Sequence, residues 1–110
     1  MAGQRGTPRS TDFLANVTSS DNTAARATQA AVAGATHYVC GISASADEAA
    51  VFLATIEDDD TVVWRGFVHN QRDVVFDTPI AIARGNKVDL ELAAAGSGKA
   101  TNGTIWGFTE

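Results

Sequence analysis

Few residues in this chain have types that could support chemistry: one cysteine, Cys40, two histidines, His37 and His69, and the acidic run Glu57–Asp60. Nucleophilic catalysis needs a hydroxyl or thiol beside a base that a third group orients. Neither histidine lies in a catalytic motif, and the residues around Cys40 match no cysteine-protease signature. We therefore expect no enzyme and no catalytic residue, with Cys40 a small buried hydrophobe and both histidines at a surface or interface.

The acidic run Glu57–Asp60 is the one candidate for metal binding. Calcium loops place their ligands at fixed alternating positions with a glycine at the sharp turn, whereas these four acids are consecutive and no glycine follows. A solvated hairpin tip is the expectation, and weak calcium binding is the alternative. The segment Gly96–Lys99 lacks the first glycine and the final Ser/Thr of a phosphate-binding loop. We expect no metal and no cofactor.

Composition excludes several classes of partner. The 110 residues contain 8 Lys and Arg against 13 Asp and Glu, for a net charge of −5, which argues against a nucleic-acid partner. A single cysteine excludes an intramolecular disulfide. No apolar run approaches the roughly 20 residues of a membrane helix, and the N-terminal residues lack the apolar segment of a secretory signal. We expect one domain that is made in the cytoplasm and has no membrane partner.

Hydrophobic periodicity predicts an all-β domain over residues 23–110. Short apolar runs alternate with turn residues at a spacing typical of a sandwich or barrel. Val88, Leu90 and Leu92 alternate with charged residues, which is the period of a strand with one buried side. Seven or eight short strands are expected, near 24–33, 37–42, 50–57, 62–69, 73–78, 88–92 and 103–109, with hairpin turns at 58–60, 84–86 and 96–98. The alanine-rich stretches 24–33 and 44–54 leave a helix as the alternative there.

The same alternation divides the side chains between an inner and an outer side. It places Tyr38, Cys40 and Ile42 inward, and it places four apolar residues on outer faces: Val39, Val63, Phe67 and Val75. Several outer apolar residues on one small domain indicate a covered surface. A second copy of the chain or a second sheet would cover them, and we expect Val63, Phe67 and Val75 to line a subunit interface. Trp64 and Trp106 are expected in the core.

The first 22 residues have a different composition. They are rich in Gly, Ser, Thr and Asn, and their one apolar cluster is Phe13 and Leu14 with Val17. Such a segment cannot bury enough surface to order itself. We therefore expect residues 1–22 to form an extended arm, either a disordered tail or a segment that docks on a partner. In the second case Phe13 and Leu14 would anchor the arm, and Arg5 and Arg9 would contact an acidic surface.

Several short motifs follow one another along residues 24–110. They are an alanine-rich strand before a glycine turn, a strand that ends in small residues, a hairpin with the pattern D-x-T-V-V-W, a Pro-Ile pair before a glycine turn, and a final G-F-T-E; they lie at Ala30–Gly34, Gly41–Ser45, Asp59–Trp64, Pro79–Ile80 with Gly85, and Gly107–Glu110. In this order the motifs resemble those of small β-sandwich proteins that decorate or cement the capsids of tailed bacteriophages. The resemblance covers roughly residues 24–110, and the usual Asp-Gly hairpin tip is missing because Asp59 and Asp60 stand there.

The resemblance implies a jelly-roll-like antiparallel sandwich that binds the phage major capsid protein as a homotrimer. Such a protein would sit on the outer capsid surface of the virion, at capsomer junctions, and would stabilise the shell. Three linked copies gain affinity through effective concentration even where each contact is weak. Two alternatives stay open. One is another virion role, as a head fibre base, a head–tail or tail component, or a receptor-binding tip. The other is a carbohydrate-binding module whose exposed aromatic residues stack on sugar rings.

Overall fold

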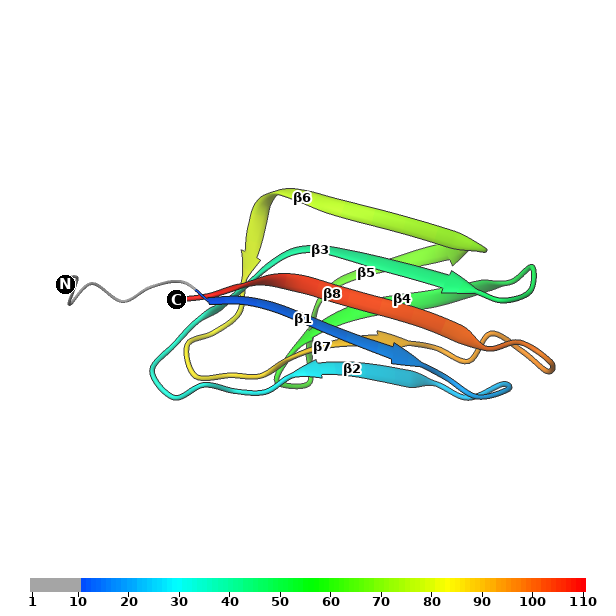
Figure 1. Ribbon diagram of the computed structural model, residues 1–110, viewed down its shortest axis with the longest axis horizontal. Coiled ribbons are helices and arrows are strands. Elements are labelled where there is room, and N and C mark those ends of the chain that lie inside the picture. The colour runs from blue at the N-terminus through cyan, green and yellow to red at the C-terminus, as the bar shows by residue number, and fades with distance from the viewer. Residues whose placement is uncertain (1–10) are drawn as a thin grey trace.

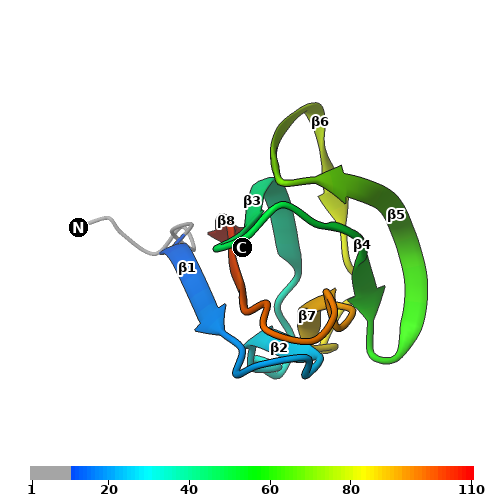
Figure 2. The same cartoon turned by 90° about the vertical axis from the view of Figure 1, so that its right-hand side faces the viewer.

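The structure is a computed structural model that describes residues 11–110, and every regular element in that range is a β-strand (Figure 1). Two four-stranded antiparallel sheets, β1-β8-β3-β6 and β2-β7-β4-β5, pack against each other (Figure 2). Residues 11–110 contain no helix with the length and apolar character needed to cross a bilayer. The strands are β1 (Thr11–Thr18), β2 (Ala25–Gln29), β3 (His37–Ala46), β4 (Val51–Asp58), β5 (Thr61–His69), β6 (Gln71–Ala81), β7 (Val88–Leu92) and β8 (Thr101–Thr109).

The strand pairing is nested, in the manner of a folded two-stranded ribbon. Strand β1 pairs with β8, β2 with β7, β3 with β6, and β4 with β5 at the tip of the ribbon. The ribbon then rolls up so that β3 also pairs with β8 and β4 with β7. This connectivity is that of a jelly roll. The prediction of a single all-β, jelly-roll-like antiparallel sandwich with seven or eight strands is confirmed.

The N-terminal boundary differs from the prediction. Residues 11–18, which were expected in the extended arm of residues 1–22, form β1 and pair with β8 along their whole length. Phe13 is only 8% exposed and belongs to the core, so it does not anchor an arm. The small apolar set in this segment suffices because β8 supplies the backbone hydrogen bonds that an isolated arm would lack. The expected roles of Arg5 and Arg9 fall outside the described residues.

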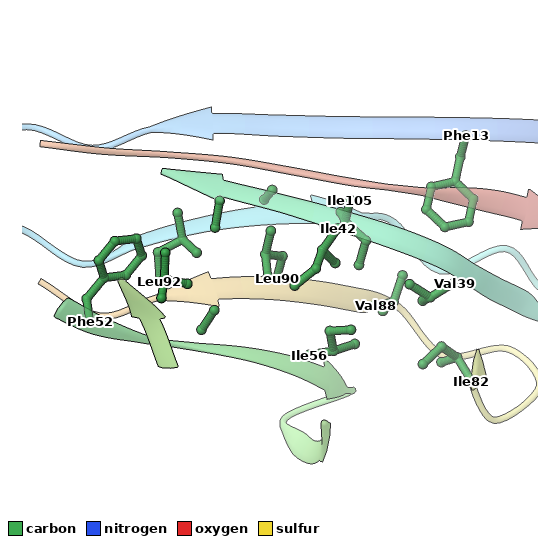
Figure 3. Close-up of a cluster of buried hydrophobic side chains, with 14 of the residues drawn as sticks. Phe13, Val39, Ile42, Phe52, Ile56, Ile82, Val88, Leu90, Leu92 and Ile105 are labelled. Atoms are coloured by element: carbon green, nitrogen blue, oxygen red, sulfur yellow. The ribbon is translucent and has the colours of Figure 1, made fainter. Parts of the chain in front are cut away.

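The core lies between the two sheets and uses one side of each strand (Figure 3). Ile42 and Ile105 from the first sheet face Leu90 and Leu92 from the second, and all four are at most 1% exposed. Gly103 of β8 makes room for this layer, because a Cβ there would lie 2.7 Å from Cδ1 of Leu92. Ala25 and Ala27 are buried on β2, so the alanine-rich stretch near residues 24–33 contains a strand, as expected.

A β-bulge in β3 reverses part of the predicted inner side. The pairing register of β3 shifts between Val39 and Gly41 against both of its neighbours. An extra residue in one strand moves the following side chains to the other face. Val39 is therefore fully buried, and the half-buried Cys40 lies on the outer side. The predictions of an inward Cys40 and an outward Val39 are both wrong.

The bulge also changes the position expected for His37, which is buried and not at a surface. Its Nδ1 lies 2.6 Å from Oγ1 of Thr109, and its Nε2 lies 2.8 Å from the carbonyl oxygen of Ala30. The carbonyl can only accept, so Nε2 donates to it, and in the neutral ring Nδ1 then accepts from the threonine hydroxyl. His37 thereby joins the segment after β2 to the end of β8. His69 is exposed, as expected.

Only one of the three expected hairpin turns joins neighbouring strands. Asp59 and Asp60 connect β4 to β5 with φ angles of 46° and 77°, which is the two-residue geometry normally filled by Asn-Gly. The turns at 84–86 and 96–98 do contain left-handed glycines, Gly85, Gly96 and Gly98. However, they lead from β6 to β7 and from β7 to β8, strands that belong to different sheets. These two are sheet crossings.

A single residue, Asn70, makes the corner where the chain passes from β5 in one sheet to β6 in the other. Its φ is 66°, and its side-chain Oδ1 accepts a hydrogen bond from the Ala50 amide at 2.8 Å. Its own amide donates to the Ala50 carbonyl, and its carbonyl accepts from Ala46. Asn70 thus holds the β3–β4 loop against the corner.

We predict that Asn70→Ala lowers the free energy of unfolding by about 2 kcal/mol, because alanine strains the left-handed corner and loses the hydrogen bond to Ala50. The matched variant Asn70→Gly keeps the backbone conformation and should lose only about 1 kcal/mol. Urea denaturation followed by tryptophan fluorescence measures both. Equal losses in the two variants would show that the left-handed backbone contributes nothing.

Candidate functional site

The outer face of the sheet β2-β7-β4-β5 carries a cluster of ion pairs, called here the charged cluster: Arg26, Glu57, Asp60, Lys87, Asp89 and Glu91. Asp89 is fully buried at its centre. Its Oδ2 accepts from Arg26 Nη1 and from Lys87 Nζ, both at 2.8 Å, and its Oδ1 accepts from Thr28 Oγ1 at 2.5 Å. Arg26 also reaches Glu57 Oε1 at 3.3 Å and Glu91 Oε2 at 3.1 Å. Cross-strand pairing of Arg26 with Glu91 and of Glu57 with Asp89 brings these charges together.

The two buried carboxylates of the charged cluster have opposite pKa shifts. Burial alone would raise the pKa of Asp89, but the hydrogen bonds from Lys87, Thr28 and Arg26 outweigh it, and the pKa of Asp89 is lowered. For Glu57, burial and a hydrogen bond with Glu91 outweigh the attraction of Arg26, and the pKa is raised. The fold therefore stabilises the charged form of Asp89, whereas it disfavours the charged form of Glu57.

Three acids of the charged cluster are close enough together to suggest a cation. One carboxylate oxygen each from Glu57, Asp60 and Asp89 lie within 4.8 Å of one another. Arg26 Nη1 lies 3.7 Å from Asp60, and Lys87 Nζ lies 3.4 Å from it, so the two basic side chains already stand among these oxygens. The acidic segment thus takes part in ion pairs. Its first and last members, Glu57 and Asp60, belong to the charged cluster, while Asp58 accepts from the Ala83 amide and the Asn86 side chain.

Beyond the charged cluster, that outer face carries exposed apolar residues on β4 and β5, with the exposed Arg65 and His69 of β5 among them. Phe67 on β5 is 60% exposed and pairs across the sheet with Leu53 of β4. Val51 is 57% exposed beside them, and Val63 is 42% exposed nearer the hairpin tip. Val63 and Phe67, two residues expected to line a subunit interface, therefore lie exposed on one strand.

The third expected interface residue, Val75, lies on the other sheet. It is 73% exposed on the outer side of β6, the edge strand of β1-β8-β3-β6. Strands β5 and β6 are consecutive and form the edges of their two sheets on the same side of the sandwich (Figure 2). The β5–β6 edge of the sandwich therefore has exposed apolar residues on both sides. Val63 and Phe67 lie on one side, and Val75 lies on the other.

Aromatic residues close that edge from within. Trp64 of β5 packs edge-to-face against Phe76 of β6, with ring centroids 5.9 Å apart. The guanidinium of Arg72 lies 5.5 Å from the Trp64 ring, and its Nη1 donates to the Phe67 carbonyl. Trp64 is partly buried and packs on the core, as expected.

Trp106, in contrast, is not a core residue. It lies on the outer side of β8, where its ring covers Gly41 of β3; a Cβ at Gly41 would come within 2.7 Å of the indole Cε2. Phe108, two residues further along β8, points to the same side and stacks on Tyr38 at 4.9 Å. The alternation of β8 already places Trp106 and Phe108 on one face, opposite Ile105. For Tyr38, in contrast, no pattern in the sequence indicates the bulge that turns its side chain outward.

A groove opens between β1 and β8 on this outer face, called here the β1–β8 groove. It has a volume of about 480 Å³, and its lining includes Asp12, Leu14, Cys40, Trp106 and Phe108. Leu14 is 63% exposed and pairs with Trp106 across the two strands. Of the two residues expected to anchor an arm, Phe13 thus points mainly into the core and Leu14 lies at this surface.

Comparisons with known proteins give only distant similarities in structure. The chain matches no protein-family model and no curated protein. Among solved structures, it is similar to PliG of Aeromonas hydrophila, a periplasmic inhibitor of g-type lysozyme, at 9% identity and a TM-score of 0.41, over 90% of this chain and 85% of that one. It is also similar to the carbohydrate-binding module CBM36, solved with calcium and xylotriose, at 12% identity and a TM-score of 0.41, over 96% of this chain and 89% of that one. That the chain is a small two-sheet antiparallel β-sandwich follows from its own strand pairing.

The opposite pKa shifts in the charged cluster predict opposite effects of neutralisation. Asp89→Asn should lower the free energy of unfolding at pH 7 by about 2–3 kcal/mol, because Arg26 and Lys87 lose a buried charged acceptor. Glu57→Gln should leave it unchanged or raise it, because burial and the hydrogen bond with Glu91 disfavour the charged form of Glu57 in the folded protein. The exposed Asp77→Asn is the control, and chemical denaturation measures all three.

The pH dependence of these variants has a defined sign. A lowered folded-state pKa means that Asp89 stabilises the fold above its unfolded pKa of about 4, and that this contribution is lost as pH falls further. The difference in the free energy of unfolding between wild type and Asp89→Asn should therefore shrink below about pH 4. The pKa shift of Glu57 has the opposite sign, so the free energy of unfolding of Glu57→Gln relative to wild type should rise as pH rises above about 4–5. A pH-independent gap for Asp89→Asn would contradict the assignment.

Proposed function

We propose that this protein is a capsid decoration protein of a tailed bacteriophage, which binds the outer surface of the capsid shell at capsomer junctions as a homotrimer. The observation that supports the proposal is the exposed apolar surface on both outer faces of the sandwich, above all Phe67 at 60% and Val75 at 73%. Apolar side chains that flank one edge from two sides are suited to contacts with other protein subunits. The motif resemblance of residues 24–110 supplies the capsid as the partner.

The placement of these residues favours a ring. A closed trimer joins two different patches of neighbouring subunits in a head-to-tail manner. Val63 and Phe67 on the outer side of β5 provide one patch, and Val75 on the outer side of β6 provides the other. Three protomers whose β5–β6 edges converge on an axis would pack the β5 patch of each against the β6 patch of the next. Full burial of Phe67 contributes on the order of 2–3 kcal/mol at each contact.

We predict that the wild-type chain sediments as a trimer of about three times its 11.4 kDa mass. Phe67→Glu or Val75→Glu should convert it to a monomer, because each variant buries an unpaired charge in every contact. Val32→Glu, which adds the same charge at an exposed valine in the β2–β3 segment, is the matched control and should stay trimeric. Sedimentation equilibrium measures all four proteins. A trimeric Phe67→Glu or a monomeric wild type would contradict the interface.

Mixing the two variants tests the head-to-tail arrangement. Phe67→Glu keeps an intact β6 patch and Val75→Glu keeps an intact β5 patch, so one undamaged contact forms between them. The mixture should yield heterodimers, whereas each variant alone stays monomeric. A symmetric contact of each patch with itself would give no such complementation, so a monomeric mixture would rule out the ring.

Capsid binding is tested by co-sedimentation with expanded, DNA-free capsids of the phage that encodes the chain. The wild-type trimer should pellet with the shells at a fixed copy number per capsomer junction and should raise the temperature at which the shells disassemble. Phe67→Glu should bind much more weakly, since a monomer loses the gain from effective concentration. A trimer that leaves shell occupancy and stability unchanged would overturn the decoration role.

A further inference from the structure

The β1–β8 groove has rigid aromatic walls. Trp106 and Phe108 point to the same side of β8, about 7 Å apart along the strand. Trp106 lies against the backbone of Gly41, and Phe108 stacks on Tyr38 with an interplanar angle of 16°. Both rings are thus supported from the β3 side. Together with the exposed Leu14 of β1, they border the groove.

The charges on this outer face are of one sign. Among residues 11–110, the charged side chains on the outer side of β1, β3, β6 and β8 are the carboxylates of Asp12, Asp73 and Asp77, and Asp12 lines the groove itself. The one basic residue of these strands, Arg72, pairs with the inward Ala44 and lies over Trp64 on the core side. The face therefore combines aromatic rings with negative charge, and it favours a positively charged occupant.

We propose that the β1–β8 groove binds an arginine or lysine side chain from a basic segment of a partner protein. The aliphatic stem of such a side chain packs on Leu14 and Trp106, as long basic side chains do on apolar surfaces. Its cation lies on the ring faces of Trp106 and Phe108, where the negative quadrupole attracts it. The carboxylate of Asp12 at the rim completes a charge-assisted hydrogen bond.

This inference adds the partner chemistry to the proposed function and uses a different part of the molecule. Val75 and the β6 edge lie at the far end of the sheet order β1-β8-β3-β6 from the groove. Trimer formation through that edge leaves the groove open on each protomer. The groove and the trimer contact can therefore fail separately: the groove is tested below on single side chains and peptides, and the trimer by sedimentation.

The test uses a capped tetra-arginine peptide as the probe and a capped tetra-citrulline peptide, which has the same shape without the charge, as its control. The chain has two tryptophans, so two indole N–H signals report binding in nitrogen–proton NMR spectra. The arginine peptide should shift the Trp106 signal and leave the Trp64 signal in place, and the binding should weaken as salt rises. The citrulline peptide should bind at least about tenfold more weakly, since a cation–π and ion-pair contribution of that order is lost.

Two variants locate the binding. Asp12→Asn, at an exposed position, should lower the affinity for the arginine peptide about three- to tenfold, as expected for loss of one charged partner. Glu48→Gln removes one exposed carboxylate in the β3–β4 loop and should have no effect. Trp106→Leu should abolish the shift in Phe108 backbone signals. The Trp106→Leu result is interpreted only together with the Asp12→Asn result, because the Trp106 ring also covers Gly41 and its loss can disturb the structure there.

Three outcomes would overturn the inference. Equal binding of the two peptides would show that charge plays no part. Equal weakening by Asp12→Asn and Glu48→Gln would show a diffuse attraction to an acidic protein. A Trp106 shift with xylotriose but none with the arginine peptide would make the groove a sugar site.

Discussion

Every strand of this sandwich packs one side against the opposing sheet, and that constraint decides which residues remain for contact with other molecules. Because successive side chains of a strand point to opposite faces, filling the core with Ile42, Leu90 and Ile105 leaves their sequence neighbours outside. The nested pairing of the jelly roll fixes which outer residues become neighbours. It places Leu14 of β1 opposite Trp106 of β8, residues that are 92 positions apart in the chain.

The β3 bulge changes which residues of that strand face the core. It lets His37 and Val39 point inward before the bulge and Ile42 after it, while Tyr38 and Cys40 turn outward. The consequence is an aromatic outer face, since Tyr38 then meets Phe108, and the missing side chain of Gly41 leaves room for Trp106. Bulges commonly redirect side chains beside functional surfaces, and here the redirected residues support the walls of the β1–β8 groove.

The two outer faces differ in the way they satisfy their polar groups. On β2-β7-β4-β5, the charged cluster pairs its buried carboxylate, Asp89, with both Arg26 and Lys87, so the charge of Asp89 is neutralised within the protein. On β1-β8-β3-β6, the outward carboxylates within residues 11–110 share their face with aromatic and aliphatic side chains and no outward basic group. The first arrangement contributes to stability, and the second leaves an electrostatic preference available to a partner.

The sequence alone determined the fold class, most strand positions and the exposure of Val63, Phe67 and Val75, because a period of two and turn-forming residues are local signals. It misplaced residues 11–18, Cys40, His37 and Trp106, because their positions depend on pairing with strands far away in the chain. An edge strand such as β1 needs only a few apolar residues once β8 supplies its hydrogen bonds, and a bulge becomes visible only when the register on both sides is known. The charged cluster and the β1–β8 groove likewise each join side chains from three strands, and only the tertiary structure brings those strands together.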